Sequence, residues 1–207
     1  MSRRFLAMAA MALIVLAVGI PAHADLLVTV ENGINGINRY DEVSGAFLGT
    51  FAPEVLGGIG LVFKDRNEAL LYVSDDASGD VLRFNMNGDL NGNGGVSLGV
   101  FAYGIGVPRF LIFGPDGNLY VSSLLTASIV RFNGNNGSPL GTFATAPGMF
   151  PEGLVFGPDG NLYVSDEVNN YVLRFNGTTG ALIGTFASGP ELNFPFCLTF
   201  SRPRGKH

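Results

Sequence analysis

Short apolar runs alternate with turn-forming residues along the chain from about residue 25 onwards. The runs are rich in β-branched and aromatic residues, and Gly, Pro, Asn and Asp separate them, which is the pattern of strands joined by turns. The turns Gly-Pro-Asp-Gly-Asn at 114–118 and 157–161 combine a proline that fixes one backbone angle with a glycine that supplies a positive φ. No amphipathic helical stretch follows residue 24, so the pattern predicts an all-β fold.

The apolar runs belong to four copies of one sequence unit. One run reads Leu-Tyr-Val-Ser at 71–74, 119–122 and 162–165, and residues 27–30 (Leu-Val-Thr-Val) are a weaker first copy. A later run carries an arginine followed by an aromatic residue, and the run after it reads Leu-Gly-Thr-Phe or a close variant. The repeated arginines are Arg39, Arg83, Arg131 and Arg174. Four short strands in a repeat of about 45 residues are typical of a β-propeller blade.

The order of the runs predicts a β-propeller of four four-stranded blades over residues 25–200, with the innermost strand of each blade first. On this order the first blade begins at its second strand, and residues 197–200 form a spare inner strand that could complete that blade and close the ring. An open arc of blades and the remnant of a longer propeller are the alternatives. The repeated arginines alternate with apolar residues on the third strands, so we expect them to be architectural rather than an anion-binding set.

The first 24 residues have the features of a secretory signal peptide. Two arginines precede the apolar run 5–20, and Ala22-His23-Ala24 is a small-residue pattern that signal peptidases accept. We therefore expect export to the periplasm or the cell exterior, with a mature chain that begins at Asp25; an uncleaved anchor is the alternative. Residues 201–207 are basic and match no part of the repeat, and we expect them to be disordered.

Composition limits the chemistry of the domain. The net charge is −5 and no basic stripe is present, which argues against a nucleic-acid partner. The two histidines, His23 and His207, lie at the two ends, so we expect no catalytic histidine within the repeats. Cys197 is the single cysteine, which excludes a disulfide framework and a cysteine-based zinc site. Its apolar neighbours indicate a small buried residue.

Candidate functional residues lie on one face of the predicted propeller, where the loops that follow the second and fourth strands meet. They are Glu31, Asp75, Ser123 and Asp166 at the ends of the second strands, and Arg109 and Glu152 at the openings of the inner strands. Converging oxygen ligands suit a hard cation, so Asp75, Glu152 and Asp166 are candidate ligands for calcium. The competing interpretation is that the strand-end carboxylates cap their own turns and that Glu152 forms a salt bridge with Arg109.

Three aromatic residues are expected on the same face. Tyr103, Phe150 and Phe194 lie in loops that carry little charge. Exposed together, they would form an apolar patch of the kind that marks a binding site, here for a protein or a polysaccharide. The alternative is that they cap the blade cores from above.

The sequence Gly-Pro-Asp-Gly-Asn-Leu-Tyr-Val-Ser-Asp at 157–166, followed by Leu-Arg-Phe-Asn-Gly-Thr-Thr-Gly-Ala-Leu-Ile-Gly-Thr-Phe at 173–186, resembles the NHL-repeat β-propellers. It is also similar to the related gluconolactonase-like and streptogramin-lyase-like propellers. The resemblance extends to exported bacterial NHL-type repeat proteins that carry a PEP-CTERM segment, although this sequence contains no such segment. It covers residues 26–200 and implies the propeller fold more specifically than any activity.

The resemblance also sets an expectation for catalysis. Gluconolactonase-like enzymes hold their metal with a glutamate that opens an inner strand, together with Asn and Asp residues around the axis. Glu152 and Asp166 match this pattern, whereas Ile59, Arg109 and Ser123 depart from it. Lyase-like propellers depend on a histidine in the ring, which these repeats lack. We therefore expect an exported, non-enzymatic binding or scaffold module for an envelope or extracellular protein or polysaccharide, with a metal-dependent hydrolase or lyase as the alternative.

Overall fold

The computed structural model describes residues 25–29, 36–52, 54–64, 70–86 and 95–201. The predicted signal peptide, Glu31 and residues 202–207 of the basic tail lie outside the described residues. Within the described ranges the chain forms strands and turns, as the sequence pattern predicts, and no helix. Accordingly, the described part holds no helix of the length and apolarity needed to span a membrane.

In the described residues, fifteen strands form four antiparallel sheets, which are the four predicted blades. Blade 1 has three strands, β1 (Asp25–Thr29), β2 (Ile37–Asp41) and β3 (Phe47–Phe51). Blade 2 has four strands, β4 (Gly58–Phe63), β5 (Leu70–Asp75), β6 (Asp80–Asn85) and β7 (Val96–Ala102). Blade 3 follows with β8 (Pro108–Phe113), β9 (Leu119–Ser123), β10 (Ser128–Phe132) and β11 (Pro139–Thr145). Blade 4 contains β12 (Pro151–Phe156), β13 (Leu162–Asp166), β14 (Tyr171–Phe175) and β15 (Leu182–Ser188).

Repeated residues of the sequence unit occupy repeated positions in the blades. In blade 2 the tyrosine of the second strand lies opposite the arginine of the third, as the pair Tyr72↔Arg83. In blade 1, Leu27 lies opposite Arg39. Residues 26–29, and not 27–30, therefore correspond to Leu-Tyr-Val-Ser, so the predicted alignment of the first copy is wrong by one residue.

Hydrogen bonds between blades support this corrected correspondence. Ser122 Oγ donates to Glu152 O over 2.6 Å, from the second strand of blade 3 to the inner strand of blade 4. Thr29 Oγ1 donates to Ile59 O over 3.2 Å in the same way between blades 1 and 2. The hydroxyl group at this position ties each blade to the next one along the chain.

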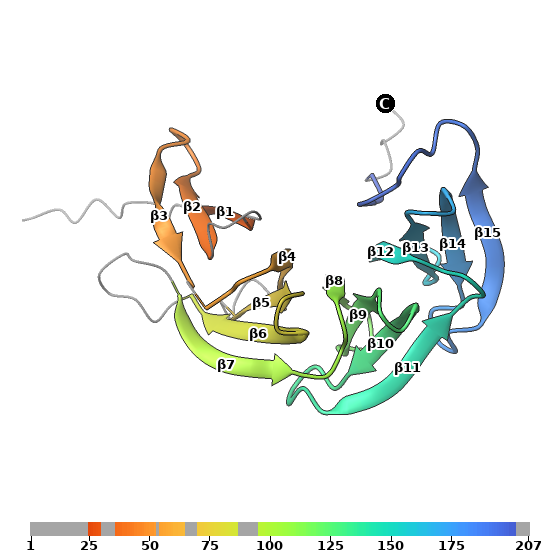
Figure 1. Ribbon diagram of the computed structural model, residues 1–207, viewed down its shortest axis with the longest axis horizontal. Coiled ribbons are helices and arrows are strands. Elements are labelled where there is room, and N and C mark those ends of the chain that lie inside the picture. Colours follow the sequence, from red (N-terminus) through yellow and green to blue (C-terminus); the bar gives the residue numbers. More distant parts are fainter. Residues whose placement is uncertain (1–24, 30–35, 53, 65–69, 87–94, 202–207) are drawn as a thin grey trace, which may run out of the picture.

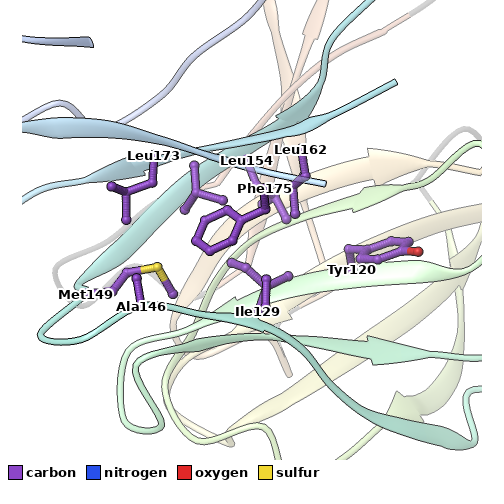
Figure 2. Packing of buried hydrophobic residues seen from close by; sticks show 10 residues of the cluster. Tyr120, Ile129, Ala146, Met149, Leu154, Leu162, Leu173 and Phe175 are labelled. Atoms are coloured by element: carbon purple, nitrogen blue, oxygen red, sulfur yellow. The ribbon is translucent and has the colours of Figure 1, made fainter. Parts of the chain in front are cut away.

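Three hydrophobic clusters fill the spaces between neighbouring blades. The cluster between blades 3 and 4 packs Tyr120 and Ile129 of blade 3 against Leu154 and Phe175 of blade 4 (Figure 2). The other two clusters fill the junctions of blade 1 with blade 2 and of blade 2 with blade 3. Full burial of each such side chain stabilises the fold by roughly 1.5–3 kcal/mol. Side-chain packing between sheets is therefore the main force that fixes one blade against another.

The four blades form an open arc (Figure 1). β1 stands at one end, and residues 195–201 stand at the other end, beside β12. Phe196 O accepts hydrogen bonds from Gly153 N at 2.8 Å and from Ser165 Oγ at 3.0 Å. The predicted spare inner strand thus lies against blade 4 and does not belong to the three-stranded first sheet.

Candidate functional site

The arc has two faces with different chemistry. The loop face consists of the connections that follow the second and fourth strands, namely residues 52, 54–57, 76–79, 103–107, 124–127, 146–150, 167–170 and 189–195. The hairpin face consists of the opposite connections, namely residues 42–46, 114–118, 133–138, 157–161 and 176–181.

The hairpin face is built of tight polar turns that satisfy their own hydrogen bonds. In the turn 114–118, Asn118 Nδ2 donates to Asp116 Oδ2 over 2.7 Å, and Tyr120 OH donates to the same oxygen over 3.0 Å. The turn 157–161 repeats this arrangement around Asp159. Because these polar groups are engaged within their own turns, they offer few free contacts to a partner.

The loop face carries large apolar side chains that are open to water. Tyr103 is 69% exposed and Leu125 is 74% exposed. The other exposed members of this set are Leu56, Phe150, Val168 and Phe194. Within the described hairpin turns, Val43 is the one comparable residue. The three aromatic residues singled out from the sequence are therefore exposed on the loop face.

A buried ion pair lies where the inner strands open onto the loop face. Arg109 and Glu152 are the second residues of the neighbouring inner strands β8 and β12. Arg109 Nε donates to both carboxylate oxygens of Glu152, at 3.0 and 2.9 Å. Arg109 Nη1 also lies 3.5 Å from Asp76 Oδ2, and the guanidinium lies over the ring of Phe196, 5.5 Å from its centroid. The salt bridge weighed for Glu152 in the sequence is present.

Burial controls the protonation of Glu152. Its side chain is 0% exposed. Burial raises the pKa of Glu152 from 4.5 to about 7, against the lowering effect of Arg109, and nearby Glu167 raises this pKa further. A group with such a pKa changes its charge within the physiological pH range. When Glu152 is ionised, it forms with Asp76 and Glu167 a set of three carboxylates beside one guanidinium, so the centre of the loop face is acidic.

Asp75 and Asp166 accept hydrogen bonds from the backbone of the loops beside them. Asp75 is buried, and its carboxylate accepts hydrogen bonds from Gly57 N at 2.7 Å and from Ala77 N at 3.2 Å. Asp166 is also buried, and it accepts hydrogen bonds from Asn169 N at 3.1 Å and from Asn169 Nδ2 at 3.0 Å. Both carboxylates cap turns, which is the role that the competing interpretation of the sequence gives them.

The structure does not assemble Asp75, Glu152 and Asp166 into one ligand group. Among the residues that the structure describes, no cluster of three or more His, Cys, Asp or Glu side chains is placed to hold a metal ion. Ser123 is likewise a loop anchor, because its Oγ donates to Ile105 O over 2.7 Å. The geometry therefore gives no support to a calcium site built from these three carboxylates, which hydrogen bonds already hold in place.

Three of the repeated arginines stack on phenylalanines of the outer strands. The guanidinium carbon of Arg83 lies 5.2 Å from the centroid of the Phe101 ring, and that of Arg131 lies 5.4 Å from the Phe143 centroid. Arg174 makes the same contact in blade 4. A contact that recurs from blade to blade is part of the architecture, as the sequence pattern predicts.

Sequence reasoning missed part of the loop face. Leu125 and Val168 occupy the same position in their turns, two residues after the strand-end residues Ser123 and Asp166. Short turns have no periodicity that separates core from surface, so only a comparison among the copies could have identified them. Cys197, expected to be buried, is exposed, because a blade covers its segment on one side only.

No protein-family model and no curated protein sequence matches the chain. Solved structures with a similar fold include a nidogen/laminin complex, at TM-score 0.61 and 18% identity over 86% of this chain and 66% of the other. Virginiamycin B lyase from Staphylococcus aureus matches at TM-score 0.58 and 14% identity, over 84% and 62% of the two chains. A putative 6-phosphogluconolactonase from Bacteroides uniformis matches at 0.57 and 18%, over 77% and 53%.

The chain spans between about half and two thirds of the length of these structures. At such identities the likeness shows the β-propeller fold alone. It agrees with the fold that the sequence repeat predicts, and it includes structures whose names describe a protein complex and structures whose names describe enzymes.

Proposed function

We propose that the chain is an exported, non-enzymatic binding module that holds a partner from the cell envelope or its surroundings on the loop face. The contrast between the two faces carries this proposal, because exposed apolar side chains gather on the loop face while the described hairpin turns are polar. Exposed apolar patches with a polar surround are typical of interaction sites, and aromatic residues are enriched in them.

Backbone strain on the same face supports the proposal. The described non-glycine residues with positive φ all lie there, namely Ala52, Val107, Ala127, Asn170 and Phe194. Ala127 and Asn170 repeat a turn position held by Gly79 in blade 2, so the blade itself explains them. Val107 (φ 49°) differs, because a β-branched residue in this region is a genuine outlier. Strain of this kind costs on the order of 1–3 kcal/mol and clusters at functional sites, and Val107 lies two residues before Arg109.

A protein is the partner class that the loop face fits best. Aliphatic Leu56, Leu125 and Val168 accompany the aromatic residues, and large apolar anchors with polar residues around them are common at protein interfaces. The carboxylates of Asp76 and Glu167, which are partly exposed beside the buried Glu152, complement a partner segment that carries Lys or Arg. A polysaccharide, which the sequence also allows, would instead stack mainly on Tyr103, Phe150 and Phe194.

Two probes test the proposal with the mature chain, residues 25–207. A displayed random-peptide library samples protein-like partners, and purified peptidoglycan and soluble glucans sample polysaccharides. The affinity of each selected probe is then measured for a triple variant, Tyr103→Ser with Leu125→Ser and Phe194→Ser. We expect a loss of about tenfold or more, because interface anchors dominate affinity.

The matched control carries Val43→Ser and Leu140→Ser, two exposed apolar residues away from the loop face. We expect its affinity to stay within about twofold of the parent. Equal losses in the triple variant and the control would contradict the proposal. Binding of glucans alone, lost in the triple variant, would keep the loop face and change the partner class.

A metal-dependent hydrolase or lyase of the gluconolactonase-like class is the second candidate function. The pKa of Glu152 near 7 favours it, since general acids and bases work best with a pKa close to the operating pH. Opposing this, both carboxylate oxygens of Glu152 accept hydrogen bonds from Arg109, and the side chain is closed to water. Hydrolysis of a sugar lactone with added calcium, abolished by Glu152→Gln, would support the enzyme; equal background rates in both proteins would reject it.

A further inference from the structure

A hollow of about 260 Å³ lies between blades 3 and 4, at the edge of the loop face. Residues 146–148 line one side of it, and residues of β14 and β15 line the other. Ala146 and Leu173 of the interblade core are its buried lining, whereas Tyr171, Leu182 and Thr185 are open to water. Both blades have four strands, so the hollow belongs to a complete junction between two blades.

Asn169 lines this hollow with a side-chain amide that is already held in place. Its Nδ2 donates to Gly148 O over 2.8 Å and to both carboxylate oxygens of Asp166, each over 3.0 Å. Asp166 is 1% exposed, so a buried carboxylate anchors an amide that is itself exposed. In the part of the chain that the structure describes, Asn169 Oδ1 accepts no hydrogen bond. The hollow therefore offers a fixed acceptor, which loses little freedom when a ligand binds.

The other lining groups indicate a neutral ligand with several hydroxyl groups. The hydroxyls of Tyr171 and Thr185 can each donate and accept a hydrogen bond. The ring of Tyr171 and the side chain of Leu182 supply apolar surface beside these polar groups, which is the mixture found in small-molecule sites. Asp166 is the one charged residue among the described lining, and it is buried and bonded to Asn169. A sugar ring, with an apolar C–H face and hydroxyls at its rim, has the matching chemistry.

The junction of blades 2 and 3 contains an equivalent hollow of about 170 Å³ that lacks this polar set. Thr142 occupies in it the position that Thr185 occupies in blade 4. In place of Tyr171, blade 3 has Ser128, which is buried. In place of the exposed amide it has Thr126, whose hydroxyl lies 2.7 Å from Ser128 Oγ. The blade architecture thus produces the hollow, and the residues of blade 4 give it binding groups.

We propose that the hollow between blades 3 and 4 binds one neutral sugar residue of a polysaccharide. Tyr171 and Leu182 pack against the C–H face of the sugar ring. Asn169 Oδ1 and Thr185 Oγ1 form hydrogen bonds with its hydroxyls, and Asp166 is a positioning residue that holds the amide of Asn169. A ligand as small as one sugar residue binds with a dissociation constant in the millimolar range. The exposed residues Tyr103, Leu125 and Phe194 of the loop face do not line the hollow, so this site does not rest on the partner proposed above.

Saturation-transfer NMR on the mature chain tests the site with free glucose, galactose, mannose and N-acetylglucosamine. We expect at least one of these sugars to bind. Thr185→Val removes a hydroxyl from an exposed position and should weaken that binding about three- to tenfold, and Tyr171→Ala should weaken it about tenfold or more. The matched control is Thr142→Val, the same change in the hollow between blades 2 and 3, which should stay within about twofold of the parent. Circular dichroism checks that each variant is folded.

The comparison with charged sugars and with the loop-face variant completes the test. Glucosamine, which carries a cationic amine, should bind no better than N-acetylglucosamine; a clear preference for glucosamine would show that Asp166 attracts a cation, and it would overturn the proposal. The triple variant Tyr103→Ser, Leu125→Ser and Phe194→Ser should keep the sugar binding even if it loses its affinity for a peptide. Loss of sugar binding in that triple variant, equal losses in Thr185→Val and Thr142→Val, or no binding of any of the four sugars would each overturn the proposal.

Discussion

Replacing Glu152 with glutamine examines how the centre of the loop face is charged. Glutamine keeps the size of the side chain and an oxygen that can accept from Arg109, but it cannot ionise. In the wild-type protein the buried carboxyl has a pKa of about 7, raised from 4.5 chiefly by burial. The native state therefore holds a proton on Glu152 over a pH range in which the unfolded chain has released it.

The sign of the effect follows from this difference in bound protons. Stability falls with rising pH wherever the native state binds more protons than the unfolded state, so the penalty is absent well below pH 4.5 and fully developed above pH 7. Each pKa unit corresponds to about 1.4 kcal/mol, so the rise from 4.5 to about 7 corresponds to about 3 kcal/mol at most. Between pH 5 and pH 8, about 2 to 3 kcal/mol of this penalty develops.

Urea unfolding of the wild type and Glu152→Gln, at several values between pH 5 and pH 8, gives the measurement. The free energy of unfolding of the wild type should fall relative to that of the variant by about 2 to 3 kcal/mol across this range, because every other titrating group is common to both proteins. Glu191→Gln, which removes an exposed carboxylate, is the control and should give a nearly constant difference. A constant difference for Glu152→Gln as well would show that Glu152 stays ionised and that Arg109 outweighs its burial.

Three further predictions address the loop face. Asp75→Ala leaves the loop donors Gly57 N and Ala77 N without their acceptor. It should lower the free energy of unfolding, measured in urea, by about 1–3 kcal/mol; a decrease below about 0.5 kcal/mol would mean that the cap is dispensable. Val107→Gly relieves the positive φ of a β-branched residue and should raise the free energy of unfolding by about 1 kcal/mol, whereas a decrease would refute strain at this position. Millimolar calcium should move the melting temperature by less than about 1 °C, since no described ligand cluster exists; a saturable rise that Asp166→Ala abolishes would show an ion site.

The blades were predictable because the sequence pattern of each strand recurs in several copies of the repeat. Arg83, Arg131 and Arg174 follow equivalent strands and make equivalent contacts, so an error in one copy is corrected by the others. The first copy has Leu27 where the others have tyrosine, so the sequence pattern places this copy one residue too late in the chain. In a strand such a slip exchanges the two faces. Only the pairing of Leu27 with Arg39 reveals the true register.

The candidate site was predictable where it depends on strand order and unpredictable where it depends on loop backbone. Arg109 and Glu152 hold the same place in adjacent inner strands, so their contact follows from the repeat. The direction in which the Asp75 carboxylate points depends instead on where its donors, Gly57 N and Ala77 N, are placed. Those directions are set by the conformation of two loops, which no residue pattern along the chain specifies.

Differences among the copies indicate where the proposed partner would bind. Packing within the blades requires the same residue at equivalent positions of each copy, as in the hairpin turns around Asp116 and Asp159. A position at which the copies differ is therefore not fixed by this packing. The second residue of the inner strand is such a position, with Arg109 in blade 3 and Glu152 in blade 4. Because the charge at this position changes from blade 3 to blade 4, the two blades are distinguishable on the loop face although the scaffold is nearly repetitive. We therefore expect the proposed partner, which would match the acidic centre and the apolar side chains around it, to dock in one orientation only, although the blades beneath it are alike.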